Sequence, residues 1–181
     1  IYADEKQNAV FIRRSLDEGK TTGATLRGTA GEDNTFKGLA KGTKRSEGWF
    51  YFQQGGQSSD PIKRAVLVES PIDAMSFAVL DRNDSRRTVY ISTDGAGSIP
   101  NEFLQTLPNK SVIVAFDNDE PGNLMAQRVM SQLPNSVRKL PKSIDWNEEL
   151  LNRFNWSKSP QAKEIKKQPQ HEQKRDRGLS L

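Results

Sequence analysis

The chain has 181 residues, of which 34% are hydrophobic, and its formal net charge is +4. It contains no cysteine and a single histidine, His171, so disulfides, cysteine-type zinc sites and catalytic triads built on histidine or cysteine are excluded from the region before that histidine. No apolar run approaches the roughly 20 residues of a membrane span and no signal peptide is visible, so we expect a cytoplasmic protein that does not enter a membrane.

The positive charge is concentrated at the C-terminus. Residues 157–181 hold seven Lys or Arg and three acidic residues, which accounts for the whole net charge. Removing them from the chain totals of 27 and 23 leaves 20 basic and 20 acidic residues in 1–156. Because the segment is rich in Gln, Lys and Pro, it is predicted to be a basic, disordered tail. Such a tail can supply salt-sensitive contacts to nucleic-acid phosphates, or serve only as a linker.

The first region, residues 1–60, is predicted to be a small β-rich annex. Short β-like runs lie at 9–13, 24–27 and 49–52, separated by stretches of Gly, Thr and Lys. Residues 20–45 carry six basic and two acidic residues, an excess that is more typical of a solvated loop than of a binding patch. Since the chain starts within what reads as a strand, we expect the annex to be a truncated N-terminal domain of a longer protein.

The second region, residues 61–156, alternates between short apolar runs and helical patterns. The predicted strands and helices follow one another in the order 65–69, 70–82, 88–92, 99–107, 111–116, 123–133, 137–140 and 145–154. Four strands that alternate with helices imply an α/β fold, with an open, mostly parallel sheet covered by helices on both faces.

Acidic residues occur where two of these strands end. Glu69 closes the first strand, and Asp117 and Asp119 follow the third. Ligands of open α/β sheets bind outside the carboxyl ends of the strands, so these side chains are expected at one edge. Asp73, four residues after Glu69, can lean back toward the same edge from the first helical turn. An all-oxygen set of this kind favours magnesium over zinc.

Each of these residues also has a purely structural interpretation. Asp, Asn, Pro and Gly after a strand are ordinary turn residues. Ser70 and Asp73 form a capping box with proline in the first turn, so Asp73 can serve the helix alone or the site as well. Glu69 has no capping duty, which favours a functional role. Asp145 opens a second capping box, and there the structural role is favoured.

The second strand ends in a glycine-rich turn, Asp94-Gly95-Ala96-Gly97. Gly95 and Gly97 could allow a bound phosphate to approach the backbone, but the turn lacks a lysine, so it is a weak indication of phosphate binding. The crowded acids indicate a bound cation, because neighbouring carboxylates repel one another and resist desolvation unless a positive charge lies among them.

The stretches VLVESPIDAMSFAVL, VYISTDGAGS, VIVAFDNDEPGNLMAQRV and IDWNEEL resemble a Toprim domain, the topoisomerase–primase fold. The resemblance covers about residues 62–154, and it places a Glu at one strand end and an Asp-x-Asp at another. It implies that Glu69, Asp117 and Asp119 bind Mg²⁺ or Mn²⁺. Asp73 matches the acid that follows the Glu by four residues in primase-type members.

The N-terminal stretches IYADEKQNAVFIRR, ATLRGT and FKGLAKGT resemble the annex that precedes Toprim in proteins of bacterial plasmids and other mobile elements. The resemblance implies that a parent protein could also carry a helicase or relaxase domain. Those proteins often have a zinc-ribbon-like segment upstream. Since no cysteine is present, we expect that segment to be missing or to precede Ile1.

The resemblance implies metal-dependent phosphoryl or nucleotidyl transfer of the primase type, with single-stranded DNA and nucleotides as partners. Glu69 is the candidate general acid or base, if neighbouring carboxylates raise its pKa. A Toprim nuclease and a non-catalytic nucleic-acid-binding module are the alternatives. A topoisomerase reaction needs a nucleophilic tyrosine, and Tyr2, Tyr51 and Tyr90 all read as strand residues.

Overall fold

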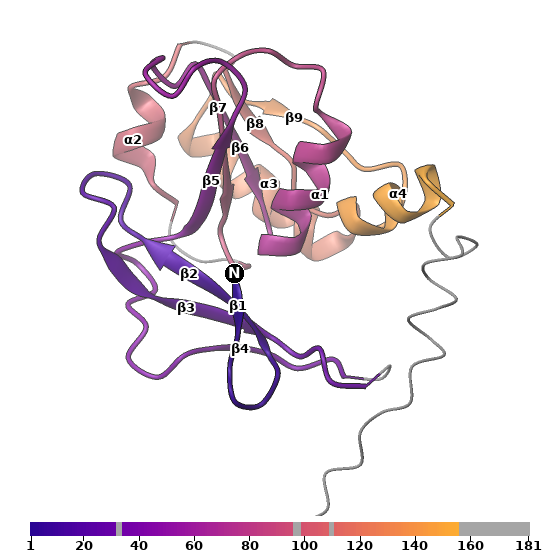
Figure 1. Ribbon diagram of the computed structural model, residues 1–181. Coiled ribbons are helices and arrows are strands. Elements are labelled where there is room, and N and C mark those ends of the chain that lie inside the picture. Colours follow the sequence, from indigo (N-terminus) through magenta and orange to yellow (C-terminus); the bar gives the residue numbers. More distant parts are fainter. Residues whose placement is uncertain (32–33, 96–98, 109–110, 156–181) are drawn as a thin grey trace, which may run out of the picture.

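A computed structural model describes residues 1–31, 34–95, 99–108 and 111–155 (Figure 1). The predictions for the C-terminal tail and for Gly97 lie outside these residues. No helix in the described part of the chain is long and apolar enough to cross a membrane.

The N-terminal region forms a four-stranded antiparallel sheet, which confirms the expected β-rich character. Its strands are β1 (Tyr2–Ala3), β2 (Ala9–Arg14), β3 (Thr21–Arg27) and β4 (Lys37–Leu39), and they lie in chain order across the sheet. The longest pairing joins β2 and β3, and its register shifts after Arg13. In Figure 1 this sheet lies below the rest of the molecule.

The second region is built on a five-stranded sheet with the spatial order β5-β7-β6-β8-β9. The strands are β5 (Phe50–Gln54), β6 (Arg64–Val68), β7 (Thr88–Ser92), β8 (Val112–Val114) and β9 (Val137–Arg138). All neighbours are parallel except β5, which runs antiparallel to β7. The predicted α/β fold with a mostly parallel sheet is therefore confirmed.

The strand predicted to begin at Trp49 lies in a different sheet from the one expected. We had expected it in the N-terminal annex, but β5 pairs with β7 along its whole length. Only Trp49 itself is bridged back to β2. The aromatic side chains explain the crossing, because Phe52 stacks on Tyr90 with ring centroids 5.2 Å apart, while Phe50 meets Phe11 edge-on at 5.3 Å.

In the described part of the chain, four helices cover the five-stranded sheet. They are α1 (Pro71–Leu80), α2 (Asn101–Gln105), α3 (Glu120–Gln132) and α4 (Trp146–Arg153). Residues of α1 and α4 belong to the core cluster on one face, and residues of α2 and α3 to the cluster on the other. The expected two-layer covering of the sheet is thus present.

The central strand β6 is buried along its full length, and its alternate residues serve opposite cores. On one face Leu67 belongs to the cluster that contains Leu104 of α2 and Val129 of α3. On the other face Val68 belongs to the cluster that contains Phe77 of α1. Because both faces of the sheet are covered, the acidic side chain of Glu69 lies just past the end of β6, where the strand leaves the core.

Three helices begin at the edge where the parallel strands end. Each has an acidic or hydroxyl N-cap whose side chain accepts a hydrogen bond from the amide three residues further on. The caps are Ser70 for α1, Asp119 for α3 and Asp145 for α4, with bond lengths of 3.2, 2.7 and 2.6 Å. This edge therefore collects strand ends and helix starts, and it faces the N-terminal sheet.

Candidate functional site

A cleft of about 570 Å³ separates the carboxyl ends of the parallel strands from strands β3 and β4 of the N-terminal sheet. Acidic side chains line the wall that belongs mostly to the five-stranded sheet, and basic side chains line the wall formed by the N-terminal region. The acidic residues are Glu69, Asp73, Asp94, Asp117 and Asp145, and the basic residues are Arg27, Lys37 and Arg45. The cleft thus separates two walls of opposite charge.

Glu69 and Asp117 meet at the centre of the acidic wall. Glu69 Oε1 accepts a hydrogen bond of 3.2 Å from the Asp117 amide. Asp117 Oδ1 is buried and has no hydrogen-bond partner among the described residues. A Cβ atom added to Gly122 would lie 2.8 Å from Glu69 Oε1 and 2.9 Å from Asp119 Oδ1. The carboxylates of Glu69 and Asp119 therefore close around this glycine, which a larger residue could not replace.

Asp73 and Asp119 have structural partners in addition to their positions near the site. Asp119 caps α3 through the Gly122 amide. Asp73 is 6% exposed and accepts a hydrogen bond from the Ser70 hydroxyl. As the side chains stand, no three acidic or histidine side chains in the described residues converge closely enough to hold an ion. The donor set and the unpartnered Asp117 oxygen nevertheless fit a hard divalent cation.

Three carboxyl groups of the acidic wall have raised pKa values. Burial raises the pKa of Asp117 to about 8, and Asp73, Glu69 and other acids add repulsion. Burial also raises the pKa values of Glu69 and Asp73. In Glu69 the hydrogen bond from the Asp117 amide opposes this rise. A divalent cation that binds Asp117 near neutral pH would therefore displace a proton.

Arg138, which the sequence analysis did not single out, supports the Asp-x-Asp turn from β9. Its guanidinium donates hydrogen bonds of 2.8 Å to the Phe116 carbonyl, 2.9 Å to the Asp117 carbonyl and 3.1 Å to Asn123 Oδ1. Burial lowers the pKa of Arg138, and the charges of Glu69 and Asp117 oppose that change. A lone arginine within the predicted strand 137–140 was the only signal in the sequence.

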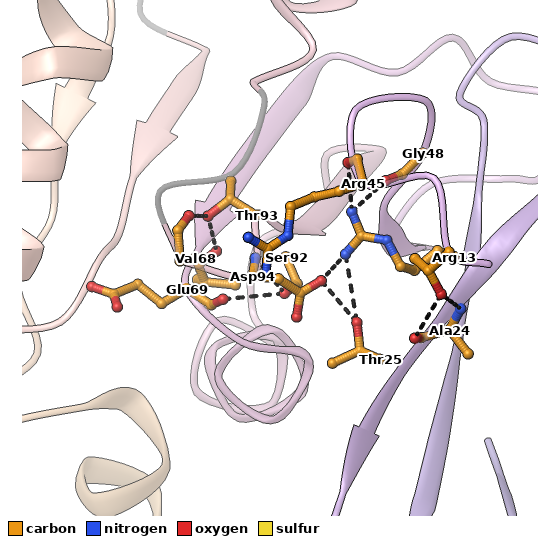
Figure 2. A network of polar contacts seen from close by, with 12 residues as sticks. Arg13, Ala24, Thr25, Arg45, Gly48, Val68, Glu69, Ser92, Thr93 and Asp94 are labelled. Atoms are coloured by element: carbon orange, nitrogen blue, oxygen red, sulfur yellow. Dashed lines mark hydrogen bonds and ion pairs between the residues drawn. The ribbon is translucent and has the colours of Figure 1, made fainter. Parts of the chain in front are cut away.

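A buried ion pair joins the two sheets beside the cleft (Figure 2). The fully buried guanidinium of Arg13 pairs with Asp94 at the end of β7. It also donates to the Gly48 carbonyl at 2.6 Å and to the Arg45 carbonyl at 3.0 Å, while the Thr25 hydroxyl donates to Asp94 at 2.8 Å. This network ties β2 and β3 to the end of β7 and so fixes the width of the cleft.

The glycine-rich turn after β7 is partly engaged within the protein. Gly95 lines the cleft, and its amide donates a 3.2 Å hydrogen bond to the Glu69 carbonyl. Asp94 and Gly95 adopt positive φ angles of 51° and 79°, which suits a glycine at the second position. Phosphate contact at Gly95 stays a prediction, and Gly97 lies outside the described residues. Asp145 caps α4, as the sequence favoured, and it also lines the cleft.

Two family descriptions match the chain. Residues 66–150 match a family described as Toprim-like, and residues 1–58 match one described as a protein of unknown function, DUF3991. The boundary between the two matches falls between β5 and β6. A search of the curated proteins gave no match.

Solved structures of bacteriophage T7 proteins share the fold. One is the T7 lagging-strand DNA polymerase interacting with primase domains of two gp4 subunits bound to an RNA/DNA hybrid and dTTP. That match has a TM-score of 0.60 at 19% identity and covers 85% of this chain and 76% of that one. The other is the primase fragment of the T7 primase-helicase protein, with a TM-score of 0.58 at 20% identity, covering 85% of this chain and 61% of that fragment.

At these identities the likeness concerns the fold, and it extends over both regions of the chain. The family match, the strand order of the sheet and the acidic residues at the strand ends all indicate a Toprim fold. The chain is a Toprim domain protein, and the region that precedes the Toprim fold, residues 1–58, matches the family described as DUF3991.

Proposed function

We propose that this protein is a metal-dependent nucleotidyltransferase of the primase type, which joins nucleotides on a single-stranded DNA template. The proposal includes a setting in plasmid or mobile-element replication or mobilisation. The observation that carries it is the cleft itself, in which an acidic wall with an unpartnered buried carboxylate oxygen faces a basic wall. Nucleotidyl transfer needs both features, because metal ions and nucleotide phosphates must meet in one place.

The metal would be Mg²⁺ or Mn²⁺, held by Glu69, Asp117 and Asp119. When bound, such an ion neutralises phosphate charge and lowers the pKa of an attacking hydroxyl. Arg138 keeps the backbone of the Asp-x-Asp turn in place through the Asp117 carbonyl. Burial raises the pKa of Glu69, and a carboxyl group with a raised pKa is suited to the general acid or base role.

The opposite wall would hold the phosphates. Arg27 is half-buried at the end of β3, and its charge interacts with that of Asp73 across the cleft. Burial lowers the pKa of Arg27, while the carboxylate of Asp73 opposes this and keeps the guanidinium charged. A phosphate that enters beside Arg27 would therefore be drawn to the cation and positioned next to the acidic residues.

The comparisons support the same reading. The T7 primase domains are described as bound to an RNA/DNA hybrid and dTTP, and the match spans the N-terminal sheet as well as the Toprim fold. The second match is a fragment of a primase-helicase, which favours a parent protein with a linked helicase. The partners proposed here are accordingly single-stranded DNA and nucleotides.

The test is incubation with single-stranded DNA, labelled nucleotides and Mg²⁺ or Mn²⁺. Extended products are expected from the wild type and not from the double variant Asp117→Asn/Asp119→Asn. A matched control is Glu5→Gln/Glu102→Gln, which removes two charges at exposed positions outside the cleft and should keep the activity. Shortened DNA would indicate a Toprim nuclease instead, and unchanged DNA a binding module.

Calorimetry measures the metal site independently of catalysis. The double variant at Asp117 and Asp119 should lose Mg²⁺ and Mn²⁺ binding while its circular dichroism stays that of the wild type. Because burial raises the pKa of Asp117 to about 8, wild-type binding near neutral pH should also release protons, so the measured enthalpy should depend on the buffer. Unchanged metal affinity in the double variant would rule out these ligands.

A further inference from the structure

An exposed aromatic side chain lies on the basic wall of the cleft. Phe36 directly precedes β4, lines the cleft and is 47% exposed. It is the sole aromatic residue among the described residues that line this cleft. Single exposed apolar residues are common on protein surfaces, so exposure alone does not indicate a function. The way in which the ring is held, and the charges around it, are more informative.

The backbone on both sides of Phe36 is fixed, and the ring lies over a glycine. The Phe36 amide donates to Asn34 Oδ1 at 3.1 Å, and its carbonyl accepts from the Gly28 amide at 2.9 Å. A Cβ added to Gly38 would lie 2.9 Å from Phe36 Cζ and 3.4 Å from Cε2. The ring therefore rests against bare backbone on one side, while almost half of the side chain stays open to solvent.

Two cationic residues lie close to Phe36 in the chain and in the sheet. Lys37 follows it in the chain, and Arg27 lies on the adjacent strand, where Arg27 pairs in register with Lys37. Both line the same cleft, and the acidic wall with Asp73 faces them. An aromatic side chain and two cations that line one cleft are the combination that binds a nucleotide unit, since the ring can stack on a base and the cations can contact its phosphate.

We propose that Phe36 is a stacking platform for a nucleobase whose phosphate lies between the basic wall and the acidic wall. The inference rests on the proposed function of the cleft and assigns to the N-terminal region the recognition of the base. Stacking accepts any base, so the platform binds without regard to sequence. The base could belong to a nucleoside triphosphate or to a DNA strand, and the ligands of the test separate these sources.

The test compares ligands that share phosphates and differ in the base. Phe36→Leu keeps an apolar side chain but removes the aromatic face. It should weaken binding of an oligo-dT strand, or of dTTP, by about five- to a hundredfold. Binding of an abasic strand of equal length, or of tripolyphosphate, should not change. Weaker binding of oligo-dT alone would assign the platform to DNA, and weaker binding of dTTP alone would assign it to the incoming nucleotide.

Three further variants separate stacking from folding. Phe36→Trp should retain affinity and show fluorescence quenching by base-containing ligands, after subtraction of the wild-type tryptophan signal. Gly38→Ala, which displaces the ring, should weaken the same ligands as Phe36→Leu. Tyr2→Leu, at an aromatic residue that is 56% exposed outside the cleft, is the matched control and should change nothing.

Equal losses for abasic and base-containing ligands in Phe36→Leu, or no loss for either, would overturn the proposal. Absence of quenching in Phe36→Trp would do the same. These binding measurements need no turnover, so they can fail while primer synthesis is observed. Conversely, stacking can be found in a protein that makes no primers, which would contradict the proposed function alone.

Discussion

Aspartates at the two ends of the five-stranded sheet have pKa values that are shifted in opposite directions. At the amino end, Arg64, which is 3% exposed, pairs with both Asp81 and Asp84. Hydrogen bonds from Arg86, with the charge of Arg64 in support, lower the pKa of Asp84 to about 2. At the carboxyl end, burial and neighbouring acids raise the pKa of Asp117 to about 8. The same residue type is thus shifted in both directions within one domain.

The difference lies in what each arginine contacts. Arg64 bonds to carboxylates, so the amino end is an electrically closed network. Arg138 at the other end donates to backbone carbonyls and Asn123, and among the described residues no cation bonds to the carboxylates of Glu69 and Asp117. Uncompensated acids that reduce stability are typical of functional sites, because a ligand supplies the missing charge. The charges at the amino end are therefore compensated within the protein, and the carboxyl end is where we propose that a ligand binds.

The largest expected effect on stability comes from removing the ion pairs of Arg64 at the amino end of the sheet. Arg64→Met removes the buried cation that Asp81 and Asp84 share, so the free energy of unfolding should fall by about 3–5 kcal/mol. Arg86→Met is the matched control, since Arg86 contacts the same Asp84 at 2.6 Å but is 52% exposed. The control should cost less than about 1 kcal/mol in urea unfolding at pH 7. Equal losses would mean that burial does not distinguish the two pairs.

The next expected effect is an increase in stability, and it comes from a substitution at the carboxyl end of the sheet. In Asp117 the folded pKa of about 8 exceeds the ordinary value of 3.8, so the folded state binds more protons between these values and stability falls as pH rises. Asp117→Asn removes this loss. In metal-free buffer the variant should be more stable than the wild type by about 1–2 kcal/mol above pH 8, and no more stable near pH 4. Urea unfolding at both pH values measures this.

Asp84→Asn is the mirror image of that experiment. Its folded pKa of about 2 lies below 3.8, so its contribution to stability is present above pH 3.8 and disappears as the pH falls through 2. The variant should therefore be less stable than the wild type at neutral pH, and the difference should shrink toward pH 2. If both Asn variants changed stability in the same direction at pH 8, the contrast between the two ends would be wrong.

The smallest expected effect is that of the metal. Magnesium at ten times its dissociation constant should stabilise the wild type by about 1.4 kcal/mol through mass action. Thermal unfolding with Mg²⁺, against KCl of equal ionic strength, measures it. Asp117→Asn should show little of this gain, because a neutral amide replaces a charged ligand. An equal gain in the variant would place the ion elsewhere.

Much of the Toprim region was predictable from the sequence, because its signals are local. The apolar runs that end at Glu69 and Asp117 located both strand ends, and the prediction of strand 88–92 coincides with β7. Once the sheet was predicted to be parallel, convergence of these acids in one region followed from topology. The cap at Asp145 was equally local, since it depends on the amide three residues further on.

The rest depended on contacts between distant segments. Arg13 and Asp94 are 81 residues apart, and nothing in either neighbourhood indicates that they pair. The basic excess in residues 20–45 was interpreted as a solvated loop, because its charge was counted along the chain and the acidic wall opposite could not be seen. Strand β5 was assigned to the wrong sheet for the same reason, since its partner β7 follows later in the sequence.

The crossing of the chain from one sheet to the other at β5 has a consequence for how the protein can be divided. The first family match ends after β5 and the Toprim-like match begins only within β6, so a gene fusion or an excised fragment that begins at residue 60 would discard β5. The fragment would expose the hydrogen-bonding edge of β7, a strand whose five residues are all buried. Exposed apolar edges pair with other chains and aggregate. The unit that can be transplanted is therefore longer than the recognisable Toprim sequence and includes β5.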